Sequence, residues 1–243
     1  MRVLREKELK DIVYGATLLG AGGGGSPENG MQLVKSTLEI AKEVQMVNPE
    51  EVPNYSMVCV VAGMGAPEAL LKRGWENEDV PALKLMEQVI GRKMDYIIAV
   101  ETGGFNSMSP LHAAAASGVP AIDGDGVGRA IPQLEMTMFC VHNLPLAPVT
   151  LADASGNSAV VYPIDPPMAE KMARGITVAF GMKAGLACHP MAGWQMKKAA
   201  IAGTYTLAEK VGRAMREATE KRKDPVEAVV KATGGFEIAR GKV

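Results

Sequence analysis

Apolar positions in the first part of the chain have the spacing of helices. Residues 7–19 carry an apolar side chain at every third or fourth position, which predicts an amphipathic helix. A run of glycines ends this helix. Ser26 is a suitable N-cap, and Pro27 suits the first position of a helix, where no backbone N–H is required. We therefore expect a second helix from Pro27 to about Lys42.

Three short apolar runs that end in glycine are typical of buried parallel strands. They are MVCVVAGMG at 57–65, YIIAVETGG at 96–104 and VPAIDGDG at 119–126. Helical patterns lie between them, so the order predicts βαβ units. The second half differs, because residues 144–165 predict a β-hairpin with a Ser-Gly-Asn turn. The expected fold is α/β, with a mainly parallel or mixed sheet flanked by helices.

The C-terminal part predicts another helix and an incomplete strand. Thr206 and Glu209 have the spacing of a capping box ahead of a helical pattern. The last ten residues, GGFEIARGKV, predict a turn into a strand at the chain end. This suggests that the fold continues after Val243 or is completed by another chain. We expect residues 1–243 to form a single α/β domain, with a sub-boundary near residue 143.

Composition and charge exclude several classes of protein. Hydrophobic residues make up 47% of the chain and charged residues 22%, as in ordinary globular proteins. The net charge of −1 argues against broad electrostatic binding to nucleic acid or to a membrane surface. The 3 cysteines have neither disulfide-framework nor zinc-finger spacing. Signal-peptide and membrane-span patterns are absent from the sequence, so we expect a cytoplasmic protein.

The stretch LLGAGGGGSPENG places consecutive glycines between two expected helices. It lacks the preceding strand of a dinucleotide-binding fingerprint and the lysine of a phosphate-binding loop. No nucleotide cofactor is expected, and a dinucleotide-dependent oxidoreductase is the least favoured function. Consecutive glycines can form a nest of N–H groups, and the following helix N-terminus would also attract an anion. The alternative is a helix end combined with a tight passage beside another backbone.

Two other glycine-rich strand ends carry acidic side chains. Glu101 and Asn106 lie in ETGGFN, where a carboxylate can act as a base, bind a metal or brace a loop. Asp123 and Asp125 alternate with glycines in DGDGVGR, and could turn toward one cation or ammonium group. An ion pair between these aspartates and Arg129 is the alternative. Ligands of parallel sheets bind beyond the carboxyl ends of the strands, so we expect these loops at one rim.

Histidine and cysteine provide weaker candidates. His112 lies in an alanine-rich helical pattern, where a buried, hydrogen-bonded histidine is expected. Cys188 and His189 are adjacent in an expected strand, and therefore point to opposite faces. That geometry argues against a thiol–imidazole dyad between them.

The order of several segments resembles the DUF917 family over nearly the whole chain. The segments are GAGGGGSP, ETGGFN, SGVPAIDGDGVGRAIPQLEM, LADASGNSAVV and AGWQMKKAAIAGTYTLAEKVGRAM. That family is associated with S-methyl-thiohydantoin desulfurase and lies beside hydantoinase genes. An Asp is usual in the family where this chain has Ser26. Family members continue into a mostly-β domain after the segment that matches GGFEIARGKV. The resemblance therefore implies that this chain carries the N-terminal α/β domain only.

The resemblance also implies a function. It points to a metal-assisted hydrolase or desulfurase acting on a cyclic imide- or thiohydantoin-like small molecule, with a divalent metal such as zinc. Glu101 would be the general base, and Asp123 and Asp125 would complete the catalytic set by holding metal or substrate. The expected substrate-binding residues are Gly22, Gly23, Gly24, Gly25, Ser26, Asn106, Arg129 and Glu135.

A non-catalytic role is the alternative. The chain would then bind a small ligand and pair with a separately encoded β-domain subunit. A homo-oligomer is the other expected assembly.

Overall fold

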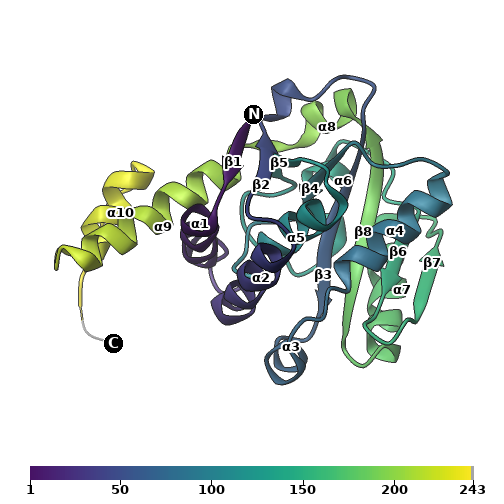
Figure 1. Ribbon diagram of the computed structural model, residues 1–243, viewed down its shortest axis with the longest axis horizontal. Coiled ribbons are helices and arrows are strands. Elements are labelled where there is room, and N and C mark those ends of the chain that lie inside the picture. The colour runs from purple at the N-terminus through teal and green to yellow at the C-terminus, as the bar shows by residue number, and fades with distance from the viewer. Residues whose placement is uncertain (242–243) are drawn as a thin grey trace.

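A computed structural model describes residues 1–241 and shows a mixed sheet with helices on both faces (Figure 1). The nine-stranded sheet has the order β1-β2-β5-β4-β3-β8-β6-β7, and β9 pairs with β5 outside this path. The strands are β1 (Arg2–Leu4), β2 (Val44–Val47), β3 (Met57–Gly65), β4 (Tyr96–Ala99), β5 (Ala121–Asp125), β6 (Val149–Ala152), β7 (Ser158–Val161), β8 (Lys183–Ala192) and β9 (Ile201–Ala202). The α/β fold expected from the sequence is confirmed.

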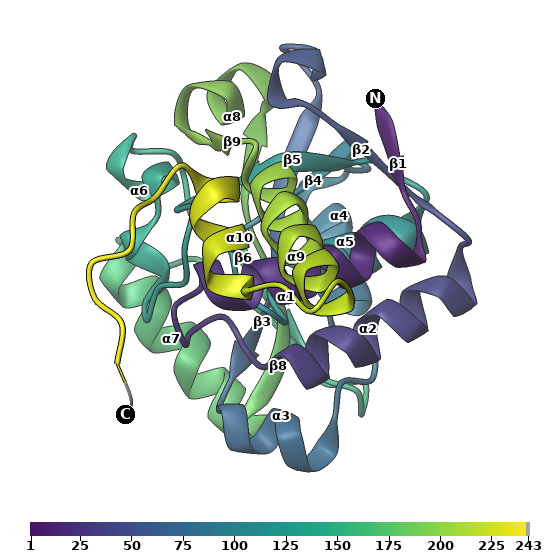
Figure 2. The same cartoon turned by 90° about the vertical axis from the view of Figure 1, so that its left-hand side faces the viewer.

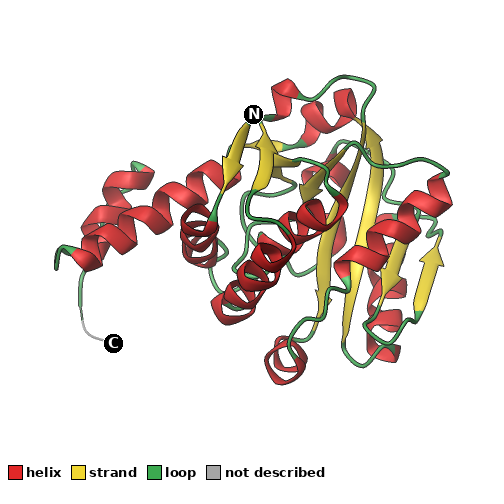
Figure 3. Cartoon of the chain, viewed as in Figure 1, coloured by secondary structure: helices red, strands yellow, loops and turns green. Residues whose placement is uncertain are grey.

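The helices connect these strands and form the two outer layers (Figure 3). The α-helices are α1 (Glu6–Leu19), α2 (Pro27–Ile40), α3 (Pro67–Arg73), α4 (Asp79–Ile90), α5 (Met108–Ser117), α6 (Met138–Val141), α7 (Pro166–Ala179), α8 (Gly193–Ala199), α9 (Thr204–Glu220) and α10 (Pro225–Thr233). Two 3-10 turns, η1 (Pro49–Glu51) and η2 (Leu134–Met136), complete the secondary structure.

The central strands are parallel and the outer ones antiparallel. β2, β5, β4 and β3 pair in parallel, whereas β8 joins β3 in the antiparallel direction. β6 and β7 form the hairpin that the sequence predicts. The predicted strands at 57–65, 96–104 and 119–126 correspond to β3, β4 and β5. Because β3 and β4 are parallel neighbours, their carboxyl ends lie at the same edge of the sheet.

Alternation along β3 divides the core into two layers. Cys59 and Val61 pack into one apolar cluster with side chains of α1, α2, α4 and α5. Val58, Val60 and Ala62 pack into a second cluster with side chains of α6, α7 and α8. This is the two-residue period of a strand buried on both faces. The helix pair α9 and α10 extends from one side of this body, and α10 lies alongside α9 (Figure 2).

Two expectations for the C-terminal part are wrong. Residues 235–241 form no strand. The helix after β9 begins at Thr204, so Thr206 lies inside its first turn rather than at an N-cap. The N-cap residue is Gly203, which has no side chain to supply a cap. Within residues 1–241, no helix combines the length and the apolar character needed to cross a membrane.

Candidate functional site

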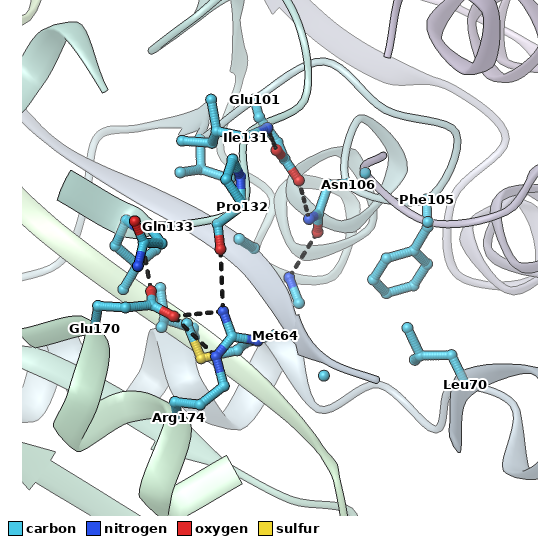
Figure 4. Close-up of a pocket in the computed structure, with 18 residues that line it drawn as sticks. Met64, Leu70, Glu101, Phe105, Asn106, Ile131, Pro132, Gln133, Glu170 and Arg174 are labelled. Atoms are coloured by element: carbon cyan, nitrogen blue, oxygen red, sulfur yellow. Dashed lines mark hydrogen bonds and ion pairs between the residues drawn. The ribbon is translucent and has the colours of Figure 1, made fainter. Parts of the chain in front are cut away.

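A pocket of about 230 Å³ opens at the carboxyl ends of β3 and β4. Its wall is formed by the end of the glycine run, the end of β3, the loop after β4, residues 131–134 and α7. Figure 4 shows Glu101 and Asn106 on one side of this space and Glu170 with Arg174 on another. The pocket therefore lies where a parallel sheet ordinarily binds its ligand.

Glu101 is the acidic side chain that the structure places in this pocket as predicted. It follows β4 and is only 5% exposed. Asn106 Nδ2 donates a hydrogen bond to Glu101 Oε1 at 2.7 Å, and the Ile131 amide donates to Oε2 at 2.6 Å. Burial raises the pKa of Glu101, and these two hydrogen bonds oppose part of the rise. The carboxyl group is thus held in one orientation and accepts a proton more readily than an exposed glutamate.

Asn106 is held by the neighbouring strand. The Gly63 amide of β3 donates to Asn106 Oδ1 at 2.9 Å. This contact assigns the oxygen of the side-chain amide to Gly63 and leaves the nitrogen to donate to Glu101. The sequence predicts Glu101 and Asn106 at one site, and the structure brings them into direct contact. Its contacts make Asn106 a residue that orients Glu101, and its predicted contact with substrate stays a prediction.

The glycine run passes very close to the loop that follows Glu101. Gly22, Gly24 and Gly25 have φ values of +94°, +72° and +81°. A Cβ atom on Gly24 would lie 2.5 Å from the Cα atom of Gly103. The Gly24 carbonyl accepts hydrogen bonds from the Phe105 and Asn106 amides, both at 3.0 Å. The tight backbone passage is therefore confirmed, and Gly24 and Gly25 also line the pocket.

The rest of the predicted glycine-rich binding segment lies outside the pocket wall. Gly22 and Gly23 are exposed. Ser26 caps α2, because its Oγ accepts from the Asn29 amide at 3.2 Å and donates to Asn29 Oδ1 at 3.0 Å. Its hydroxyl is therefore engaged in the helix cap predicted for it rather than aimed at the pocket.

Asp123 does not reach the pocket with Glu101. Asp123 Oδ1 accepts from the Thr206 amide at 3.0 Å, and Oδ2 accepts from the Thr206 hydroxyl. Asp123 of β5 therefore caps α9, because the N-cap residue Gly203 has no side chain that could do so. The cation near its carboxylate is Arg2 at 3.7 Å. The expected position of Asp123 at the pocket rim is wrong, because α9 covers this face of β5.

Asp125 braces the loop after β5 instead of facing a ligand. It accepts hydrogen bonds from the Val127 amide at 2.7 Å, the Gly128 amide at 2.5 Å and the Thr102 hydroxyl. Burial raises the pKa of Asp125, and these hydrogen bonds oppose the rise. Of the alternatives left open by the sequence, the structure shows loop bracing, with backbone amides in place of Arg129.

Arg129 and Glu135 also lie outside the pocket wall. Arg129 is exposed, and its Nε donates to the Ala130 carbonyl at 3.3 Å. Glu135 belongs to the short turn η2, and its Oε2 is buried. Neither residue lines the pocket, so their predicted contacts with substrate stay predictions.

Sequence reasoning missed Glu170 and Arg174 of α7. Glu170 Oε1 accepts from Arg174 Nε at 2.8 Å, and Oε2 accepts from the Leu134 amide at 3.0 Å. The Arg174 guanidinium also donates to the Pro132 carbonyl at 3.3 Å. The available signal was an acidic and a basic residue four positions apart, a pattern also common on solvent-exposed helices. Nothing in that pattern places α7 beside Glu101.

The described residues do not fit a resident divalent metal. Among residues 1–241, no three His, Cys, Asp or Glu side chains gather in an arrangement that could hold a metal ion. The oxygens of Glu101 and Asp125 already accept protein donors. The structure therefore offers the expected zinc-like metal no set of ligands within these residues.

His112 and His189 are both buried and lie outside the pocket wall. His112 is fully buried, and its Nδ1 lies 2.7 Å from Asp79 Oδ2. His189 lies near Cys140 rather than Cys188, with 3.8 Å between His189 Nε2 and Cys140 Sγ. Burial lowers the pKa of His189 to about 4. The His189 ring therefore points toward Cys140, as expected if adjacent residues of a strand point to opposite faces.

The chain matches the models of two family domains. Residues 7–163 match the S-Me-THD-like N-terminal domain, and residues 164–243 match the S-Me-THD-like C-terminal domain. The expectation that this chain carries the N-terminal domain alone, without the family's C-terminal domain, is therefore wrong. β8 of the second segment lies between β3 and β6 of the first, so both segments build one sheet.

A solved structure supports the same relationship. The chain is similar to a crystal structure of a protein from Chromobacterium violaceum, with a TM-score of 0.86 and 29% sequence identity. The match covers 95% of this chain and 65% of that protein, so this chain spans about two thirds of its length. No curated protein matches the chain. From the two domain matches, which together cover residues 7–243, the chain belongs to the S-Me-THD-like family.

Proposed function

We propose that the pocket binds a small cyclic imide- or thiohydantoin-like molecule and that Glu101 transfers a proton during its hydrolysis. The observation that carries this proposal is the position of Glu101. It is a buried carboxyl group of raised pKa, fixed by two donors in the wall of a pocket at a strand end. Such a group is suited to general base catalysis near neutral pH. The family match favours a hydantoin-related ring as the substrate.

The proposed reaction replaces a ring carbon–sulfur bond with a carbon–oxygen bond. For S-methyl-thiohydantoin, a water molecule adds to the ring carbon that carries sulfur. Glu101 accepts one proton from that water and passes it to the ring nitrogen of the C=N bond, so that the carbon carries a hydroxyl group and the S-methyl group. The carbon–sulfur bond then breaks, the hydroxyl proton moves to the departing sulfur, methanethiol leaves and the ring carbon becomes a carbonyl. The product is hydantoin, and the reaction requires no oxidant or reductant.

The surrounding residues would orient the reacting groups. Asn106 and the Ile131 amide hold the Glu101 carboxyl, as their hydrogen bonds show. The amides of Gly24 and Gly25 border the pocket and would donate to a ring oxygen or to the oxyanion that forms on water addition. The Arg174 guanidinium, also in the wall, would favour a substrate with negative charge on the ring.

The experiment is a thiol-release assay with S-methyl-thiohydantoin, read with a thiol-reactive chromophore. Removal of a general base typically lowers kcat by about 100- to 10,000-fold, which we expect for Glu101→Gln. Glu87→Gln is the matched control, because Glu87 is also a buried glutamate that accepts a backbone amide, from Met94 at 3.0 Å. It does not line the pocket. Equal turnover by Glu101→Gln and the unmodified protein would refute the role of Glu101.

A non-catalytic ligand-binding subunit is the second candidate. It is favoured by α10, which has no buried residue in this chain. A helix of this kind offers a surface to a further domain or subunit. Hydantoin binding by calorimetry without thiol release would support this candidate, and thiol release by the purified chain would exclude it.

A further inference from the structure

Residues 129–134, here called the pocket strap, cross from the Glu101 side of the pocket to α7. At one end, the Thr102 amide donates to the Arg129 carbonyl at 3.3 Å, and the Ile131 amide donates to Glu101 at 2.6 Å. At the other end, Arg174 donates to the Pro132 carbonyl and the Leu134 amide donates to Glu170. Figure 4 shows Pro132 between these two groups of contacts.

The strap has few other attachments. Arg129, Pro132 and Gln133 are exposed, and the strap contributes only Ala130 and Leu134 as buried residues. Glu170 itself is firmly placed, because it is only 7% exposed and is paired with Arg174. A hydrogen bond from a backbone amide to a buried carboxylate is strong, because the acceptor is charged. Breaking it would leave a buried N–H group without a partner, which costs free energy.

We propose that Glu170 and Arg174 are positioning residues, which clamp the strap so that the Ile131 amide stays on the Glu101 carboxyl. The role of Glu101 in catalysis rests on the proposed function, but its contact with Ile131 does not. Glu170 would act on Glu101 only through the backbone between Ile131 and Leu134. Glu170 on α7 therefore influences the proton affinity of the Glu101 carboxyl, which lies in the loop after β4.

Release of the strap raises the pKa of Glu101. The Ile131 hydrogen bond favours the charged carboxylate, and its loss leaves burial less opposed. The charged groups that face Glu101 are Asp125 from β5 and, across the pocket, Glu170 and Arg174 from α7. Removing the Glu170 charge acts in the opposite direction, because a lost negative charge lowers the pKa of a nearby acid. Replacing Glu170 by alanine thus has two opposite effects on the Glu101 pKa: release of the strap raises it, and loss of the Glu170 charge lowers it.

The test is a carbon-13 NMR titration of the glutamate carboxyl groups in the full chain, with the Glu101 signal assigned from Glu101→Gln. The Glu101 pKa should be about one unit higher in Glu170→Ala than in Glu170→Gln, which corresponds to the loss of one hydrogen bond to a carboxylate. Glu170→Gln removes the same charge but keeps an oxygen that can accept the Leu134 amide. We expect no rise in Glu170→Gln, and the contrast between the two variants isolates the strap from the charge.

Glu217→Ala is the control for loss of an ion pair away from the pocket, because Glu217 of α9 pairs with the C-cap residue Lys221, four positions later, at 3.2 Å. It should leave the Glu101 pKa unchanged. A Glu101 pKa that is no higher in folded Glu170→Ala than in Glu170→Gln would overturn the proposal. If Glu170→Ala does not fold, Arg174→Ala decides, since Arg174 is half exposed. Faster hydrogen exchange of the Ile131 amide in Arg174→Ala is then expected, and an unchanged exchange rate would overturn the clamp.

These measurements use no substrate, so their result is separate from that of the thiol-release assay. If thiol release is observed, the acidic limb of the kcat pH profile should move upward in Glu170→Ala with the NMR pKa. A lower kcat without that movement would indicate a merely structural role for Glu170.

Discussion

Replacing Gly24 by alanine tests why the chain carries consecutive glycines. Gly24 has a φ of +72°, and its added Cβ would lie 2.5 Å from Gly103 Cα and 3.3 Å from Gly103 N. The left-handed conformation costs a residue other than glycine about 1–2 kcal/mol. Forcing two backbones apart costs about 1–3 kcal/mol more. Gly24→Ala should therefore lower the free energy of unfolding by about 2–5 kcal/mol.

Gly22→Ala is the control within the same glycine run. Gly22 has a φ of +94°, but an added Cβ would have no neighbouring atom within 4 Å. Its replacement should cost only the conformational part, about 1–2 kcal/mol. Urea unfolding followed by circular dichroism gives both free energies of unfolding, provided that the slope of this free energy against urea concentration is the same in both variants and the unmodified protein. Equal losses in the two variants would refute the close approach of the glycine run to the loop after Glu101.

Three further predictions concern buried titratable and capping groups. Asp123→Ala should lower the free energy of unfolding by about 1–3 kcal/mol, because α9 loses its cap. Thiol release should be retained in this variant, and a variant that keeps its full stability but loses turnover would contradict this. His189 should titrate by NMR at a pKa of about 4, and titration near its ordinary 6.5 would show that the imidazole is not buried. The raised pKa of Glu101 means that its folded form favours the proton, so its contribution to stability is present at low pH and is lost as pH rises through that pKa. Urea unfolding between pH 4 and about pH 8 should show a smaller loss in Glu101→Gln than in the unmodified protein, because the pH-dependent contributions of Asp125 and His189 are present in both.

Local patterns predict much of this fold. The apolar runs that end in glycine correspond to β3, β4 and β5, and the Ser-Gly-Asn turn joins β6 to β7. Parallel neighbours also place Glu101 near the end of β3, where it meets Asn106. These features follow from the period of a buried strand and from turn chemistry, both of which are encoded over a few residues.

The errors arise where distant segments meet. Asp123 is buried because α9, far along the chain, covers it and uses its carboxylate as a cap. Glu170 and Arg174 enter the pocket because α7 packs beside the end of β3, which no local pattern indicates. The position of β8 between β3 and β6 likewise depends on packing between segments that are distant in sequence. Burial and partner choice at these positions are tertiary effects.

The central claim is that the pocket beside Glu101 is the site of ring hydrolysis. A crystal structure of the protein with hydantoin, the proposed product, tests it most directly. We predict that the ring lies between Glu101 and the amides of Gly24 and Gly25. A ring N–H should be at about 2.7–3.2 Å from a Glu101 carboxyl oxygen. Hydantoin bound elsewhere, with the Glu101 pocket empty, would contradict the account.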